Sequence, residues 1–239
     1  MLELRGIVKR FGGVMALDGV SFGVAQGEIV GLMGANGAGK TTLFAVIAGN
    51  IVPQAGDVLW HGESLVGLRP DQIARRGIAR TFQVVRPFLG LTVRENAATA
   101  ARFGARQLRA PRRVDEAARD ALDAVGLLNR ADRMANELTL SDQKRLEIAR
   151  AIATGAELLL LDEVMAGLTP PEIAEMLEIL AGLRTRRGLT LLVIEHVMRA
   201  LMELSDRIVV LHLGRTIAEG PPQAIAAEAE VSRVYFGHD

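Results

Sequence analysis

The stretch Gly34-Ala35-Asn36-Gly37-Ala38-Gly39-Lys40-Thr41 decides the fold of this chain. It fits the pattern G-x-x-x-x-G-K-(S/T), in which a glycine-rich backbone turns tightly and directs its N–H groups at phosphate oxygens. In this pattern the lysine, here Lys40, places a charge on the β- and γ-phosphates, and the hydroxyl of Thr41 binds Mg²⁺. These eight residues and Thr42, which follows them, are therefore candidate nucleotide-binding residues.

The sequence on either side of this loop has the order that phosphate binding requires. Residues 28–33 are an apolar run that predicts a buried strand before the loop, and residues 42–49 have the composition of a helix after it. Phosphates would then also lie at a helix N-terminus. The alternative is a glycine-rich turn without a ligand, and the order of strand, loop and helix argues against it.

The composition restricts the class of protein. The chain has 239 residues, of which 49% are hydrophobic, and its formal net charge is zero, so no nucleic-acid partner is expected. The absence of cysteine excludes a disulfide framework and thiolate metal sites. No apolar run approaches the roughly 18 residues of a membrane-spanning helix, and the first residues lack a signal-peptide pattern. We expect a soluble protein, in which any membrane role comes through a partner.

The organisation along the chain predicts an α/β fold. Residues 2–24 alternate apolar and polar side chains around Gly12-Gly13, which predicts antiparallel strands. Residues 94–137 are rich in alanine and arginine and predict helices. We therefore expect a P-loop NTPase core with an antiparallel β-subdomain and an inserted helical subdomain. In this single domain, 1–239, the core with its β-subdomain comprises residues 1–93 and 155–239, and the helical subdomain comprises residues 94–154.

Arginines gather in the predicted helical subdomain, with no acidic residue between Glu95 and Asp115. A solvated face with a loop is the favoured interpretation, because charge runs usually have that role. The alternative is a contact with acidic lipid or with an acidic partner surface. The arginines concerned are Arg102, Arg106, Arg109, Arg112 and Arg113.

Polar residues follow three predicted strands, where chemistry on a bound nucleotide is expected. Asp162 ends the strand 158–161 and can hold Mg²⁺ directly or through water, while Glu163 faces the other way and can act as a general base. Gln83 follows another strand, where its amide can ligate Mg²⁺ and orient water. His196 follows a third, where an imidazole can hydrogen-bond a γ-phosphate. An ordinary structural role is the alternative for Gln83 and His196.

With these residues placed, the chain resembles the ATPase subunit of an ATP-binding cassette (ABC) transporter over nearly its whole length. The resemblance implies that Phe11 stacks on adenine and that the cofactors are ATP and Mg²⁺. It also implies that two cassettes enclose two ATP molecules head to tail, and that hydrolysis moves the attached membrane domains. The matching positions, in order, are Phe11, Gly34 to Thr42, Gln83, Leu138 to Gln143, Leu158 to Glu163, Ala166-Gly167-Leu168 and His196.

Three further segments resemble the branched-chain amino-acid uptake branch of that family: Arg80 to Gln83, Arg145 to Arg150 and Val234 to Gly237. The implied partners are two transmembrane permease subunits, a second ATPase subunit in a homodimer or heterodimer, and indirectly a periplasmic substrate-binding protein. The implied location is cytoplasmic, peripheral on the inner face of the cell membrane. A lipopolysaccharide-export ABC ATPase and a non-transport ABC ATPase are the alternatives.

The chain departs from the family in its signature segment, which usually reads Leu-Ser-Gly-Gly-Gln. Here the aligned residues are Leu138-Thr139-Leu140-Ser141-Asp142. Thr139 to Asp142 are the residues expected to contact the ATP of the partner subunit. Leu140 and Ser141 replace both glycines, and Asp142 adds a negative charge near the expected γ-phosphate. We expect Ser141 to cap the following helix, and the site to be weaker but still present. The hypothesis that follows is pairing with a different ATPase whose signature is intact.

Overall fold

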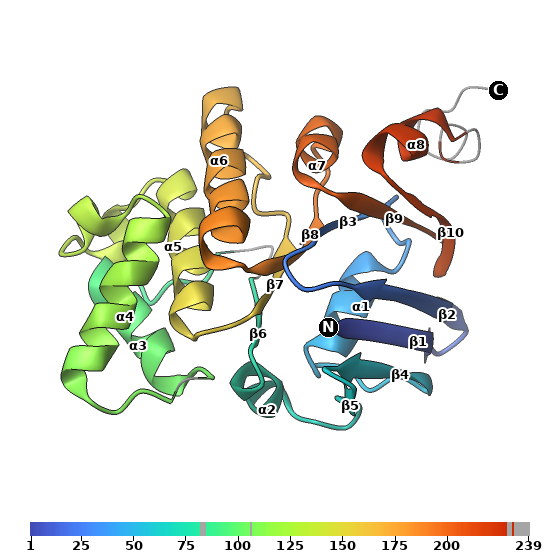
Figure 1. Cartoon of the computed structure of the whole chain (residues 1–239), viewed down its shortest axis with the longest axis horizontal. Coiled ribbons are helices and arrows are strands. Elements are labelled where there is room, and N and C mark those ends of the chain that lie inside the picture. Colours follow the sequence, from blue (N-terminus) through green and yellow to red (C-terminus); the bar gives the residue numbers. More distant parts are fainter. Residues whose placement is uncertain (82–84, 106, 229–230, 232–239) are drawn as a thin grey trace. The chain divides into compact units, whose positions relative to one another are not determined.

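The computed structural model describes residues 1–81, 85–105, 107–228 and 231, and the chain divides into two compact units. The first unit comprises residues 1–70 and 190–239, and the second comprises residues 71–189. Each contains strands and helices, which confirms the predicted α/β class (Figure 1). The division into a core and a helical subdomain at residues 94–154 stays a prediction.

An antiparallel sheet opens the first unit, as the alternating pattern predicts. Its strands lie in the order β2-β1-β4-β5, and Gly12 adopts a positive φ of 55° at the turn between the first two. Glycine is favoured there because a side chain would strain this backbone conformation. The strands are β1 (Leu2–Phe11), β2 (Val14–Val24), β4 (Ala55–Trp60) and β5 (Glu63–Ser64).

A second set of strands in the first unit lies in the order β10-β9-β3-β8. β3 pairs in parallel with β8 and β9, and every residue of β3 and β8 is buried, which explains their continuous apolar sequences. Parallel neighbours end at one edge of the sheet, so the residues after β3 and β8 emerge side by side. The strands are β3 (Ile29–Gly34), β8 (Thr190–Ile194), β9 (Arg207–His212) and β10 (Arg215–Gly220).

Three helices pack on these strands of the first unit. α1 contacts β2 and β3, α7 contacts β3, and α8 contacts β9 and β10 (Figure 1). Their bounds are α1 (Lys40–Ile47), α7 (Met198–Leu204) and α8 (Pro222–Ala227). In the part of the chain that the structure describes, no helix is long and apolar enough to cross a membrane.

The second unit combines a parallel strand pair with a cluster of helices. β6 pairs with β7, and α3, α4 and α5 pack on one another, which confirms the helices predicted from alanine-rich and arginine-rich sequence (Figure 1). The elements are α2 (Pro70–Arg75, which begins at the boundary), β6 (Ile78–Arg80), α3 (Val93–Phe103), α4 (Pro111–Ala124), η1 (Leu128–Arg130), η2 (Ala135–Glu137), α5 (Leu140–Ala153), β7 (Leu158–Asp162) and α6 (Pro170–Arg187).

Helix α6 begins at a defined cap. The Glu172 carboxylate accepts the backbone N–H of Thr169 at 2.8 Å and its hydroxyl at 2.7 Å. These hydrogen bonds, the backbone one foremost, lower the pKa of Glu172 from its usual value. Pro170 occupies the first turn, where its missing N–H has no helical partner to lose. The cap fixes the direction of the chain that leaves the acidic pair at the end of β7.

Candidate functional site

The phosphate-loop sequence forms the predicted strand, loop and helix in the first unit. β3 ends at Gly34 and α1 begins at Lys40, two residues earlier than the composition predicts. Between them Gly37 and Gly39 adopt φ values of 83° and 108°, which L side chains rarely reach. The loop closes with a hydrogen bond of 3.0 Å from the Ala38 N–H to the Ala35 carbonyl. Glycine at these two positions therefore allows the backbone conformation of the loop.

Lys40 is held over this loop. Its ammonium donates to the carbonyl of Gly34 and, at 3.1 Å, to that of Ala35, and only 6% of the residue is exposed. These contacts hold the buried ammonium at the loop, where its positive charge can attract an incoming phosphate. Thr41 is exposed beside it, with its hydroxyl at the start of α1. This donor set fits the polyphosphate of a nucleotide.

We expect Gly39→Ala to abolish phosphate binding and to lower the melting temperature. A Cβ at Gly39 would lie 2.5 Å from the Ala16 carbonyl oxygen, and φ is 108°. Gly37→Ala is the matched control, since Gly37 also has a positive φ but nothing lies within 4 Å of its Cβ. The melting temperature of this control variant should fall by about 2–8 °C, from backbone strain alone. Calorimetry and titration with a fluorescent ATP analogue test this, and equal effects of the two variants would contradict it.

His196 and Phe11 also belong to the first unit. β3 and β8 run in parallel register with Leu32 opposite Ile194, so exposed His196, two residues after β8, lies at the edge from which the phosphate loop starts. Phe11 ends β1, and 48% of it is exposed. The Lys9 ammonium lies 5.2 Å from the centre of its ring. An exposed ring with a cation over it is available for stacking.

The acidic pair lies in the second unit at the end of β7. Asp162 is 2% exposed, and its Oδ2 accepts a hydrogen bond of 2.9 Å from Arg80. Glu163 is half-buried and adopts a φ of 53°, which is uncommon outside glycine. Strained backbone of this kind is frequent at functional sites because the surrounding structure holds it. Here the Lys144 ammonium donates to the Glu163 carbonyl at 2.9 Å.

The altered signature has a different cap from the expected one. α5 begins at Leu140 and its N-cap is Thr139, whose hydroxyl accepts the Asp142 N–H at 3.3 Å. The prediction that Ser141 caps this helix is therefore wrong. Thr139 lies three residues before Asp142, which is the spacing of a side-chain cap, so Ser141 falls inside the first turn. Its buried hydroxyl has no hydrogen-bond partner within the described part of the chain.

The negative charge of Asp142 is neutralised inside the protein. The carboxylate is buried, accepts the Thr139 hydroxyl at 3.0 Å and forms an ion pair with Arg130. It also lies in the first turn of α5, where the helix dipole favours a negative charge. Leu140 is 45% exposed, and its side chain packs within 3.3 Å of where a Cβ on Gly167 would lie. The bulk at position 140 is therefore the larger change to this segment.

Gln83 lies outside the described residues, as does Arg106. In residues 1–81, 85–105, 107–228 and 231, no three acidic or histidine side chains gather into a metal-binding group. The Thr41 hydroxyl of the first unit and the Asp162 carboxylate of the second are each the kind of oxygen donor that Mg²⁺ binds in proteins, together with phosphates and water.

The structure adds three residues that the motifs did not single out for chemistry: Arg80, Arg130 and Lys144. Arg80 and Arg130 pair with Asp162 and Asp142, and buried Lys144 holds the backbone of Glu163. Lys144 is one of only three lysines in a chain that otherwise uses arginine, and that rarity was the available sequence signal. The two arginines carried no comparable signal.

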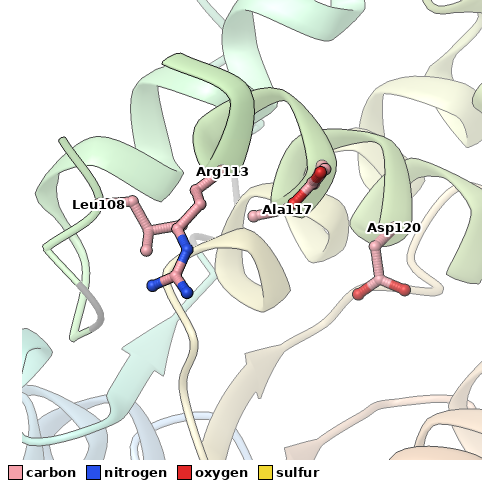
Figure 2. A pocket seen from close by; sticks show the side chains of 5 residues that line it. Leu108, Arg113, Ala117 and Asp120 are labelled. Carbon is pink, nitrogen blue, oxygen red and sulfur yellow. The ribbon is translucent and has the colours of Figure 1, made fainter. Parts of the chain in front are cut away.

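Two arginines of the helical region, Arg112 and Arg113, lie beside acids. Arg112 pairs with Glu116, and Arg113 lines a pocket of about 340 Å³ with Leu108, Glu116, Ala117 and Asp120. Figure 2 shows Arg113 beside Leu108, with Ala117 and Asp120 further along α4. Arg112 is 91% exposed in its side chain. These acids moderate the positive charge that the sequence suggested, and the role of the arginine cluster stays a prediction.

This combination of phosphate loop, acidic pair and signature segment is that of an ATP-binding cassette, and comparison with known proteins agrees. Residues 17–166 match the ABC transporter family. The chain belongs to this family and is an ABC ATPase. It is 42% identical over 249 residues to LivG, the high-affinity branched-chain amino acid transport ATP-binding protein of Escherichia coli (strain K12), covering 99% of this chain and 98% of that protein.

Solved structures give the same result. The ADP conformation of MJ1267, an ATP-binding cassette of an ABC transporter, superposes with a TM-score of 0.88 at 29% identity, covering 100% of this chain and 99% of that one. A dimeric post-hydrolysis state of the cassette MJ0796, bound to ADP and Pi, gives a TM-score of 0.82 at 26% identity, covering 93% and 99%. The predicted ABC ATPase fold is thus confirmed.

Proposed function

We propose that this chain is the ATP-hydrolysing subunit of an ABC importer for branched-chain or related amino acids. The observation that carries the proposal is its 42% identity to LivG across nearly the full length of both proteins. That relative is named for amino-acid transport, which favours import over the lipopolysaccharide-export alternative. The chain works on the inner face of the cell membrane with two permease subunits, and a periplasmic protein delivers the substrate to them.

The proposed chemistry assigns a role to each site residue. The backbone of residues 34–39 and the Lys40 ammonium hold the phosphates, and Phe11 stacks on the adenine. Thr41, Asp162 and Gln83 hold Mg²⁺, which when bound neutralises charge on the phosphates. Glu163 accepts the proton of the attacking water, and His196 hydrogen-bonds the γ-phosphate. The backbone strain and the Lys144 contact at Glu163 support this assignment, since they hold the carboxylate-bearing residue in place.

Transport measurements in cells test the proposed substrate class. A strain without this chain should lose most high-affinity uptake of radiolabelled leucine, isoleucine or valine. The wild-type chain should restore it, and Glu163→Gln, produced at the same level, should not. Unchanged uptake of these amino acids, together with a defect in lipopolysaccharide delivery to the outer membrane, would establish the export alternative instead.

We further propose that the partner is a different ATPase with an intact signature, so that the two ATP sites are unequal. Leu140 and Ser141 supply side chains where glycine would let a phosphate approach the backbone N–H groups of α5. The exposed leucine side chain supports this most, because it stands at the start of the helix. The site that uses this chain's phosphate loop would receive the partner's signature and hydrolyse normally.

Restoring glycine at both positions tests whether the two ATP sites are unequal. Leu140→Gly combined with Ser141→Gly should raise ATP turnover of the assembled complex by roughly 10- to 100-fold, the value of one charge-assisted hydrogen bond. Loss of the Ser141 hydroxyl removes no hydrogen bond between described residues, so the variant should fold. Asp142→Asn is the control for charge alone and should have the smaller effect. Unchanged turnover of the glycine variant would rule out the substitution as the limiting feature.

A further inference from the structure

We propose that Arg80 is a tethered counter-ion that occupies Asp162 in the absence of metal and competes with Mg²⁺ for its carboxylate. The inference rests on the proposed role of Asp162 in holding Mg²⁺. Arg80 is the last residue of β6 and Asp162 the last of β7. They are 82 residues apart in the sequence, yet Arg80 Nη2 lies 2.9 Å from Asp162 Oδ2.

The strand register places the two side chains together. β6 and β7 are parallel, and Arg80 lies opposite Leu160, so its side chain projects on the same face as those of Leu160 and Asp162. Just beyond β6 the Thr81 N–H donates to the Leu160 carbonyl at 2.9 Å, and the Thr81 hydroxyl accepts the Asp162 N–H at 3.1 Å. These bonds fix both strand ends, so the ion pair forms without mobile backbone.

Burial makes this contact different from the surface ion pairs of the second unit. The Arg80 and Asp162 side chains are 12% and 2% exposed, whereas Arg112 and Glu116 are 91% and 59% exposed. An ionised carboxylate buried this deeply is strongly destabilising unless a cation compensates it. Arg80 supplies that cation when no metal is present. The Arg80 contact therefore offsets the cost of burying the Asp162 carboxylate while no metal is bound.

The same contact limits the affinity for Mg²⁺. A guanidinium on Oδ2 occupies one oxygen of the carboxylate and cancels much of its charge, and both effects disfavour a second cation nearby. Metal binding must then weaken or displace the Arg80 contact, and the two events are coupled in free energy. Arg80 therefore sets the Mg²⁺ concentration at which nucleotide binds well. It is a positioning residue, since it acts through Asp162.

Metal-free stability gives the first test. Arg80→Gln keeps a hydrogen-bond donor but removes the charge, and without metal or nucleotide it should lower the melting temperature by roughly 6 °C or more. Arg112→Gln makes the same chemical change in an exposed ion pair and should shift it by less than about 2 °C. Combining Arg80→Gln with Asp162→Asn should recover part of the lost melting temperature, because both charges are then removed and no buried charge is left unpaired. Strictly additive losses would overturn the counter-ion role.

Titration with Mg²⁺ gives the second test, on the isolated chain with trinitrophenyl-ATP as a fluorescent probe. Arg80→Gln should bind the probe at about fivefold lower Mg²⁺ concentration than wild type, and Arg80→Lys should stay near wild type because it keeps the charge. A Mg²⁺ midpoint that equals that of wild type in Arg80→Gln as well as in Arg80→Lys would overturn the competition. If Arg80→Gln does not fold, a Mg²⁺ midpoint of Arg80→Lys that differs more than about twofold from wild type would overturn it too.

Two measurements on Asp162 separate the competition by Arg80 from the metal site itself. In the wild-type chain, probe binding should depend on Mg²⁺, and Asp162→Asn should weaken that dependence. Absence of both effects would mean that Asp162 does not hold Mg²⁺, and the proposed site would fail. Their presence, combined with an unaltered midpoint in Arg80→Gln, would remove the competition proposed for Arg80 and leave the metal site standing.

Discussion

Replacing Glu163 with glutamine should lower ATP turnover of the assembled complex by a factor of about 10²–10⁴, the usual contribution of a general base. Glutamine has the shape of glutamate but cannot accept the proton of the attacking water. The contact from Lys144 goes to the backbone carbonyl of Glu163 and should survive the change, so nucleotide affinity should stay within about threefold. The variant should therefore bind ATP and accumulate as an ATP-bound dimer.

Steady-state hydrolysis, probe binding and light scattering with and without ATP measure these three outcomes. Glu178→Gln is the matched control, because it removes the same charge from an exposed position of α6 in the same unit. That variant should hydrolyse ATP at the wild-type rate. Unimpaired hydrolysis by Glu163→Gln would refute the role of Glu163 as the general base, and slow hydrolysis by both variants would point to a general effect of charge.

Replacing Lys40 with methionine should weaken ATP binding by about 100-fold or more, as loss of one partner from a buried charge contact commonly does. The ammonium is buried and donates to the carbonyls of Gly34 and Ala35, so it is already placed where phosphate is expected. Methionine has a similar length and no charge. Loss of ATP binding should bring loss of hydrolysis with it, whereas Glu163→Gln should lose hydrolysis alone.

Arg10→Met serves as the control for Lys40→Met, because Arg10 is an exposed cation on β1 of the same unit. Titration of both variants with the fluorescent ATP analogue separates a local contact from an effect of net charge. A similar loss in the two variants would contradict the local contact. ATP affinity near wild type in a correctly folded Lys40→Met chain would remove Lys40 from the phosphate site.

The sequence was sufficient to predict the structural features that depend on local patterns of residues. The glycine pattern of residues 34–41 predicted a phosphate loop, the apolar run before it predicted a strand, and the composition after it predicted a helix. The structure forms all three. The apolar run before Asp162 likewise predicted a buried strand, and β7 is buried throughout. Such features depend on neighbours in the chain, so their periodicity and turn residues reveal them.

The sequence could not predict the contacts between residues that are far apart in the chain. The pairs of Arg80 with Asp162 and of Arg130 with Asp142 depend on strand register and on the path of the loop before α5. The cap of α5 was misplaced for a related reason, because Thr139 and Ser141 both favour N-cap positions and only the backbone decides between them. The sequence therefore identified the unusual signature and the structure showed how its added charge is neutralised.

Affinity isolation of this chain from detergent-solubilised native membranes, with identification of every protein that co-purifies, would test both the transport function and the unequal ATP sites. We expect two distinct permeases and a second cassette with an intact signature, as in an importer with unequal ATP sites. Recovery of the permeases with this cassette alone would contradict the proposal that the two ATP sites are unequal. Recovery of ribosomes or DNA-repair proteins in place of permeases would contradict the transport function itself.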